Sequence, residues 1–395
     1  MLYFSKMQKI IHKYIIREIL GPFLIGIVIF TFILIISNLV RLTEMIVAKG
    51  AGVSEVVKLF LGIIPAFLSL TLPMAFLLGV MIALSRLSAE NEISALKSSG
   101  IGMGQIYRPI FFLSIFTILL NLGITLFAAP LANYNFRQHL FKLLKNRITL
   151  GLKEKVFNHN LGRMVFYANS IRDQGKTIQG ILINLSDPAL FPHPVLISAR
   201  EGNFQPSPEQ FIYLKLTQGE IQTLGQDLKN FQSIHFSDLL LKLDLNRMIP
   251  EVASPKKKLK ELTLPELRRE IQSLPGNHPD RFLYLTELER RFAIPFSPLA
   301  FGIIGLPLGI HNRRRLGRGF GFVVTILLLL LYYLLLHFGE MLGIKGYPLA
   351  MWLPNLFLIV LGTYLFIRAY FEFPFLPMEW ALSSVEKFRS RFSNR

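Results

Sequence analysis

The chain has 395 residues, of which 52% are apolar and 12% aromatic, with a mean hydropathy of +0.45 and a formal charge of +18. Few water-soluble proteins combine such hydropathy with several long apolar stretches, so the composition favours a membrane protein. The absence of cysteine excludes disulfides, thiolate metal sites, iron–sulfur clusters and cysteine nucleophiles.

Six windows are long and apolar enough to span a bilayer, which requires about 20 residues per helix. Three precede and three follow a segment of different character, and they are Ile19–Val40, Val56–Ser85, Ile106–Ala129, Phe292–Ile310, Phe320–Phe338 and Tyr347–Ile367. The first window is long and runs into Arg41, so we expect a retained helix rather than a cleaved signal peptide.

Lysine and arginine are unevenly distributed over the connections between these windows. If the N-terminus is cytoplasmic, sixteen basic residues lie on that side, and the short outer connections hold only Arg41, Lys49, Lys58 and Lys345. The positive-inside rule then predicts that both termini are cytoplasmic and that the segment between the third and fourth windows is exported.

In the exported segment, roughly residues 130–291, apolar runs become short and alternate with polar residues, which indicates β-structure. The candidate strands are Met164–Asn169, Gly180–Leu185, Val195–Arg200, Phe211–Leu216, Glu220–Leu224 and Ser233–Leu243. Turn signals such as Asp187-Pro188 and Gly202-Asn203 separate several of them. Many short antiparallel strands favour a sandwich, a jelly roll or an open barrel, and an unpaired edge strand could accept a strand from another chain.

The sequence thus predicts an α+β membrane protein with a β-domain inserted between two halves of three helices each. Residues 1–129 form the first transmembrane half, and residues 130–291 form the exported domain, whose stretch Pro255–Leu274 is expected to be a helical connector. Residues 292–368 form the second transmembrane half, and residues 369–395 form a cytoplasmic tail.

No nucleotide-binding or catalytic signature is visible in the sequence. Gly175-Lys176-Thr177 resembles the end of a P-loop, but Ser170 stands where the first glycine is needed, so a hairpin turn is favoured. Glu340 and His337 near one end of the fifth window are interpreted as structural or interfacial groups, with a proton relay as the alternative. We therefore expect no enzyme activity, bound cofactor, metal or nucleic acid.

The connection between the second and third windows, about residues 86–99, predicts a short amphipathic helix that Gly100 ends as a C-cap. Apolar residues share one face of it and two carboxylates lie beside them: Leu87, Ile93, Leu96, Glu90 and Glu92. Such a helix could dock in a groove on a soluble partner. The alternative is a solvated or membrane-surface helix.

Two further features lie at helix ends and in the second half. Arg41, at the outer end of the first window, is a candidate partner for phosphates of an outer-leaflet lipid, or an ordinary interfacial anchor. Small residues and prolines recur around the fourth and fifth windows and permit close helix packing or a lateral gate: Gly302, Gly305, Gly309, Gly317, Gly319, Gly321, Pro295, Pro298 and Pro307.

The order of these parts resembles the LptF/LptG (YjgP/YjgQ-type) permeases of the lipopolysaccharide-export ABC transporter. The resemblance covers nearly the whole chain. It rests on Ile11–Glu18, Leu39–Arg41, the loop Ala89–Gly100, and the fourth helix with the basic loop that follows it. The final stretch Ala350–Leu356 is closer to LptF than to LptG.

The resemblance implies a permease subunit that pairs with an LptG-type paralogue and sits on a dimeric cytosolic ATPase of the LptB type, which binds the ATP. The pair would extract lipopolysaccharide from the outer leaflet of the bacterial inner membrane. The exported domain is expected to be a periplasmic jelly roll that passes the lipid to a bridge of LptC/LptA-type jelly-roll proteins.

The resemblance also implies roles for individual positions. Glu92 matches the glutamate that contacts the ATPase, and its neighbours Glu90, Ile93 and Leu96 are expected to take part. Arg41 matches a basic residue that meets lipid A phosphates, whereas Asn38 stands where some LptF sequences have a lysine, so phosphate recognition would be weaker or shared with Lys49 and the partner. Gly317, Gly321 and Pro307 are the candidate gate and packing residues.

Two other functions remain open from the sequence. The first is a membrane scaffold or mechanotransmission subunit that moves no lipid itself and drives an exported partner. The second is a proton-coupled carrier, which would depend on Glu340.

Overall fold

The computed structural model describes residues 2–47, 53–146, 154–161, 164–172, 177–185, 194–206, 211–224, 231–244, 256–276, 278–310 and 320–370. In this part of the chain six helices are long and apolar enough to cross a membrane: Lys9–Asn38, Val57–Ala89, Met103–Lys142, Pro279–Ile310, Gly321–Ile344 and Ala350–Arg368. Together with an antiparallel sheet, they confirm the prediction of an α+β membrane protein.

The elements group into two compact units. The first contains Met1–Phe32, Phe67–Ala128 and Thr263–Arg395, and the second contains Ile33–Ala66 and Ala129–Leu262. Helix α1 (Leu2–Val47) and helix α2 (Val53–Ala89) contribute to both units. The other elements of the first unit are α3 (Glu92–Ser98), α4 (Met103–Gly123), the π-helix η1 (Ile124–Ala128), α8 (Leu264–Ser273), α9 (Pro279–Ile310), α10 (Phe320–Ile344), the 3₁₀ turn η4 (Ala350–Trp352) and α11 (Leu353–Tyr370).

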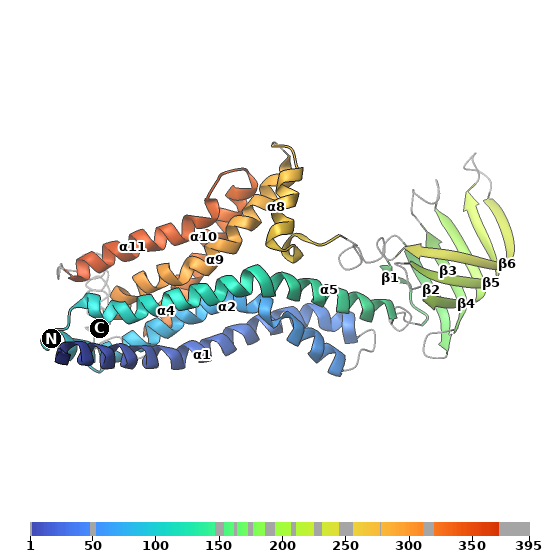
Figure 1. Cartoon of the computed structure of the whole chain (residues 1–395). Helices are drawn as coiled ribbons and strands as arrows, with labels where there is room; N and C mark the ends of the chain where they lie inside the picture. Colours follow the sequence, from blue (N-terminus) through green and yellow to red (C-terminus); the bar gives the residue numbers. More distant parts are fainter. Residues whose placement is uncertain are drawn as a thin grey trace, which may run out of the picture. The chain divides into compact units, whose positions relative to one another are not determined.

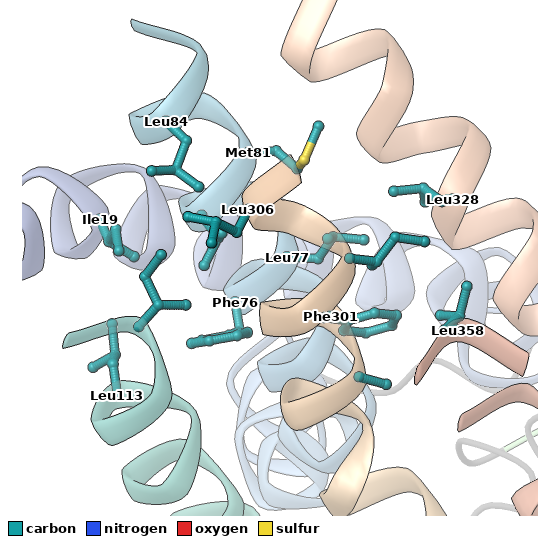
Figure 2. Packing of buried hydrophobic residues seen from close by; sticks show 14 of the residues in the cluster. Ile19, Phe76, Leu77, Met81, Leu84, Leu113, Phe301, Leu306, Leu328 and Leu358 are labelled. Atoms are coloured by element: carbon teal, nitrogen blue, oxygen red, sulfur yellow. The ribbon is translucent and has the colours of Figure 1, made fainter. Parts of the chain in front are cut away.

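Six helices of the first unit pack around one apolar core. Figure 2 shows side chains from these helices pointing toward one another; one from each is Ile19, Phe76, Leu113, Phe301, Leu328 and Leu358. Lipid tails are as apolar as leucine, so close packing rather than exclusion of water holds such helices together. The core extends from Leu87 and Ile93, where α2, α3 and α4 are connected, to Ala293 and Met351.

Glycines allow α9 and α10 to approach α2 closely. A Cβ atom on Gly305 would lie 2.9 Å from Cγ1 of Val80, and one on Gly309 would lie 2.6 Å from Cβ of Leu84. A Cβ atom on Gly321, near the start of α10, would lie 3.0 Å from the carbonyl oxygen of Met81. Atoms of α2 thus occupy the space that a side chain on these three glycines would need. This close approach agrees with the interpretation of the small residues as helix-packing positions.

The third apolar helix is longer than predicted. The prediction ended it at Ala129 and placed β-structure after it, but the helical region runs from Met103 to Lys142, and α5 spans Ala129–Asn146. Pro130 has no N–H group to donate within a helix, and the π-helical turn η1 directly before it accommodates this interruption. The end of the apolar window was therefore a poor indicator of the end of this helix.

The second unit contains one six-stranded antiparallel sheet in which every strand pairs with its neighbour in sequence (Figure 1). Its strands are β1 (Asn158–Leu161), β2 (Met164–Arg172), β3 (Thr177–Leu185), β4 (Val195–Pro206), β5 (Phe211–Leu224) and β6 (Phe231–Asp244). A sheet with this strand order is a β-meander. The jelly roll stays a prediction. The predicted turn at Gly202-Asn203 is wrong because both residues lie inside β4, and Asp187-Pro188 lies outside the described residues.

A bend crosses the middle of the sheet. Gly180 in β3 and Gln218 in β5 have φ values of 61° and 54°, and the paired register passes over both of them and over Arg200 in β4. The register is the same on both sides of the bend, so no residue is inserted in any of these strands. The left-handed backbone at Gly180 changes the alternation between faces, and Ile178 and Ile181 are both buried although three residues apart. For the same reason β5 is one strand, and the prediction of two strands was wrong.

The bend folds the sheet over its own apolar face. The rings of Phe166 in β2 and Phe204 in β4 are 6.1 Å apart. The register pairs Phe166 with Ile183 and Ile183 with Ile197, so on a flat sheet the two phenylalanines would be separated by about 20 Å along the strands. A single bent sheet thus forms its own core, in which Phe166 and Leu214 are fully buried.

Helix α5 is joined to the returning chain by a buried ion pair. Nε of Arg137 lies 2.7 Å from Oε1 of Glu261, in the 3₁₀ turn η3 (Leu259–Glu261), and the two side chains are only 6% and 5% exposed. Oε2 of Glu261 accepts a bond from the backbone N–H of Lys258, and Arg137 also donates to the carbonyl of Lys256. This pair connects the segments that enter and leave the sheet.

Candidate functional site

The connection between α2 and α4 contains the short helix α3, which lies between two residues with positive φ, Asn91 and Gly100. Asn91 adopts a left-handed conformation (φ 59°) between the end of α2 and the start of α3, and such a residue interrupts a helix. The predicted helix over residues 86–99 is therefore two helices, since α2 continues to Ala89. Gly100 (φ 83°) ends α3 as predicted, and Ile101 donates its N–H to the carbonyl of Leu96.

Apolar residues anchor α3 to the core of the first unit. Ile93 is 3% exposed and Leu96 packs against the same core while partly buried, next to Leu87 of α2, which is 0% exposed. Ile93 and Leu96 were expected to contact an ATPase, but the structure places them against the chain's own helices. A partner of α3 in this conformation would meet its other face.

The other face of this connection is polar and exposed. It consists of Glu90, Asn91, Ser94, Ala95, Lys97, Ser98, Ser99 and Gly100. Glu92, at the first position of α3, lies between the exposed face and the anchored face and is half-buried. One side of α3 is therefore packed against the core, and the opposite side is exposed to solvent.

Charged and polar side chains of α1 and α2 surround Glu92, and we call Tyr14, Glu18, Arg86, Glu90 and Glu92 the Glu92 cluster. The Tyr14 hydroxyl donates to Oε2 of Glu92 across 2.6 Å. Arg86 lies 2.8 Å from a carboxylate oxygen of Glu18 and 3.7 Å from one of Glu90. The cluster therefore connects three helices at one end of the bundle.

A hydrogen bond joins the end of α9 to the same region. The hydroxyl of Ser88 donates to the backbone carbonyl of Ile310 over 2.7 Å. Because Ile310 is the last residue of α9, its carbonyl has no partner within the helix, and Ser88 provides one. The end of the second-half helix α9 is thus tied to the residues that lead into α3.

The predicted lipid-phosphate site is only partly within the described residues. Arg41 lies inside α1, Lys49 lies outside the described residues, and phosphate binding by either stays a prediction. Asn38, which stands where some family members have a lysine, donates its side-chain amide to the carbonyl of Leu34, one turn earlier.

The candidate gate residues are also partly described. Gly317 lies outside the described residues, whereas Gly321 packs against the end of α2 and Pro307 is buried inside α9. The structure thus brings Gly321 together with Met81 and Ser85. A gating role for these residues stays a prediction.

Glu340 and His337 belong to an interhelical charge network. Oε1 of Glu340 lies 3.7 Å from Arg290 of α9, and its Oε2 lies 3.8 Å from His337. His337 is 75% exposed. These distances agree with the interpretation of Glu340 and His337 as structural or interfacial groups.

Sequence reasoning missed three members of the Glu92 cluster, namely Tyr14, Glu18 and Arg86. Tyr14 and Glu18 are four residues apart, and each directly precedes a fully buried isoleucine, Ile15 and Ile19. Residues at this spacing share a helix face. A polar pair next to an apolar pair on one face could therefore have indicated polar contacts at the edge of the core. No sequence pattern, however, indicated which segment they would meet.

Comparison with known proteins identifies the family. The family "Lipopolysaccharide export system permease LptF/LptG" matches residues 13–368. The LptF proteins of Escherichia coli K12 and Shigella flexneri are 22% identical over 391 residues, which is 98% of this chain and 99% of theirs. An uncharacterised protein of Rickettsia prowazekii is 24% identical over 234 residues, 59% of this chain and 63% of that protein.

The family match covers both halves of the helical unit, the sheet between them and the Glu92 cluster. The full-length relatives named above are LptF proteins, in agreement with the LptF-like stretch Ala350–Leu356. The chain therefore belongs to the LptF/LptG family of lipopolysaccharide export permeases.

Proposed function

We propose that this chain is the LptF-type permease subunit of an ABC transporter that extracts lipopolysaccharide from the outer leaflet of the inner membrane. Its partners are an LptG-type permease and a dimeric cytosolic ATPase of the LptB type, which binds and hydrolyses the ATP. Three helices cross the membrane before the sheet and three after it, with both termini cytoplasmic and the sheet in the periplasm.

External work is required because of the substrate. Exposing a lipid chain to water costs about 0.8 kcal/mol per CH₂ group, so a lipid with several acyl chains leaves a bilayer only when sheltered and driven. Since the sequence carries no nucleotide-binding motif, this chain receives that work by contact with the ATPase.

The observation that carries this proposal is the construction of α3. Ile93 is 3% exposed and holds the helix to the bundle core, while Ser94, Ala95 and Lys97 are exposed on the opposite side. A partner that pushes on the exposed side moves the core helices with α3. Glu92 supplies a carboxylate beside this surface for a basic residue of the ATPase.

The sheet is the proposed receiver of the lipid. Its bent apolar face, with Phe166 and Leu214 buried, offers an apolar interior, and β6 is a 14-residue edge strand. Ile234 and Leu240 on β6 are each 57% exposed, and an open edge of this length can pair with a strand of another chain. We propose that a periplasmic LptC/LptA-type jelly-roll protein continues the sheet at this edge.

Charge reversal at α3 tests the ATPase contact. Glu92→Lys should abolish co-purification of the ATPase with the permease pair, because it places like charges opposite each other. Lys97→Glu, on the exposed face of the same helix, is the matched control for a change of charge alone. Full retention of the ATPase by Glu92→Lys would contradict the proposal.

Photo-crosslinking from position 41 tests lipid transport. A photoreactive amino acid replacing Arg41 should capture lipopolysaccharide in cells with an active ATPase. A subunit that only supports or drives another protein would capture none, and this outcome would favour the scaffold over the permease.

A further inference from the structure

We propose that Tyr14 is a positioning residue for Glu92: its hydroxyl holds the carboxylate in one orientation and ties α3 to α1, so that force applied at Glu92 reaches α1. This inference rests on the proposed function, in which Glu92 contacts the ATPase. It assigns a role to Tyr14 and to the inner face of α1, which the comparisons leave unassigned.

The geometry of the bond supports a positioning role. The Tyr14 hydroxyl and Oε2 of Glu92 are 2.6 Å apart, although the residues are 78 positions apart in the chain. A bond of this length between a hydroxyl and a carboxylate belongs to the strong, charge-assisted class. In the described part of the chain no second hydrogen bond or ion pair engages Glu92, so Oε1 is available to a partner.

The chemistry of the donor distinguishes Glu92 from its neighbours. Glu18 and Glu90 both face the cation of Arg86, which offsets their charge. Glu92 is held by the neutral phenol of Tyr14, and Tyr14 in turn has a side-chain hydrogen bond with Arg86. The cation therefore reaches Glu92 only through the phenol, which fixes the orientation of the carboxylate without an ion pair. A carboxylate of this kind attracts a partner's basic residue more strongly than one already paired with a cation.

The attachment of α1 provides the path for movement. Ile15 follows Tyr14 directly, Ile19 lies one turn beyond, and both side chains are 0% exposed in the bundle core. Glu18, on the same turn, binds Arg86 of α2 at 2.8 Å. A displacement of Glu92 therefore acts on a segment of α1 that is packed into the core, and not on a freely moving end.

The test measures lipopolysaccharide release per ATP hydrolysed by the complete transporter in proteoliposomes. Tyr14→Phe removes the hydroxyl and keeps the ring, and Tyr347→Phe makes the same change at a tyrosine that is 61% exposed. We expect Tyr14→Phe to lower release per ATP by about tenfold, the lower end of the factor that corresponds to the loss of a hydrogen bond to a charged group, with assembly and the ATPase rate retained. Tyr347→Phe should match the wild type.

A double variant separates positioning from a general structural effect. If Tyr14 acts through Glu92, Tyr14→Phe should cause no further loss in a chain that already carries Glu92→Ala. Losses that multiply, a coupling ratio of Tyr14→Phe equal to the wild type, or a failure of assembly in Tyr14→Phe that Glu92→Ala does not share would each overturn the inference. If Glu92→Ala itself leaves assembly and release intact, the proposed ATPase contact fails first.

Discussion

The carboxylate of Glu261 lies 2.7 Å from Nε of Arg137, and both side chains are almost completely buried. Removing one partner leaves the other charge buried without its counter-ion, which costs about 3–5 kcal/mol. We therefore predict that Glu261→Ala markedly lowers the thermal unfolding temperature of the purified protein. Hydrogen bonds from Arg137 to the returning chain will be weakened at the same time.

An exposed ion pair of the same domain provides the control. Lys215 and Asp238 lie 3.3 Å apart with side chains 46% and 60% exposed, and pairs of this kind contribute about 0–1 kcal/mol. Asp238→Ala should therefore leave the unfolding temperature nearly unchanged. Equal losses in Glu261→Ala and Asp238→Ala would contradict the structural role given to the buried pair.

Ile93 should be essential for the anchoring of α3. Ile93→Ala removes a buried side chain, and such changes cost about 2–5 kcal/mol, so it should lower thermal stability and expose α3 to protease. Ser94→Ala, at the exposed neighbouring position, is the control and should resemble the wild type. Limited proteolysis of the detergent-solubilised protein measures both effects, and resistance of Ile93→Ala equal to the wild type would refute the anchoring.

Close packing of α9 on α2 should make Gly309 intolerant of a side chain. A Cβ atom there meets Leu84 at 2.6 Å, and overpacking of this kind costs about 1–3 kcal/mol. Gly62 lies within α2, and a Cβ atom there would have no atom of the described residues within 4 Å, so Gly62→Ala should be neutral or slightly stabilising. Unfolding temperatures of Gly309→Ala and Gly62→Ala check the difference, and an unchanged Gly309→Ala protein would be inconsistent with the packing.

The proposed topology can be measured directly because the chain contains no cysteine. Lys97→Cys places a thiol on the exposed face of α3, and Asp238→Cys places one on β6. In spheroplasts a membrane-impermeant maleimide should label Asp238→Cys at once and Lys97→Cys only after permeabilisation. The reverse pattern would invert the proposed orientation.

The distribution of apolar residues along the chain predicted the helical part of the fold well. Long apolar windows do not depend on distant contacts, so six membrane-length helices followed from the sequence and lie within one or two turns of the predicted bounds for most ends. Three ends differ by more than two turns: the first helix begins at Lys9, the third continues to Lys142 and the fourth begins at Pro279. At each of these ends the helix continues into more polar sequence beyond the apolar window from which it was predicted.

The strands were predicted in position but not in extent. Alternation of apolar and polar residues located five of the six described strands, but a break in alternation was interpreted as a turn. In β5 the break at Gln218 is a left-handed residue inside one continuous strand, and the register with β4 is unchanged on either side of it. A left-handed residue within a strand and a turn give the same local signal, and only the pairing of both halves of β5 with β4 distinguishes them.

For the site, the sequence identified the segment but not its contacts. Glu92 and Gly100 were recognised from resemblance and local pattern, and Ile93 was placed on a partner-facing surface although it is anchored in the core. Tyr14 entered the sequence analysis only as part of Ile11–Glu18, one of the stretches that resemble the family. Its bond to Glu92 joins residues 78 positions apart, and such a contact depends on how three helices pack.

The central claim, that α3 transmits work from an ATPase to this permease, is tested most directly by Glu92→Ala. The variant is assembled with its partner permease and ATPase in proteoliposomes, and ATP hydrolysis and lipopolysaccharide release are measured together, with Ser94→Ala as the control. The account predicts that Glu92→Ala loses ATPase association or releases far less lipopolysaccharide per ATP, while Ser94→Ala behaves as the wild type. Wild-type ATPase association and release per ATP in Glu92→Ala would contradict it.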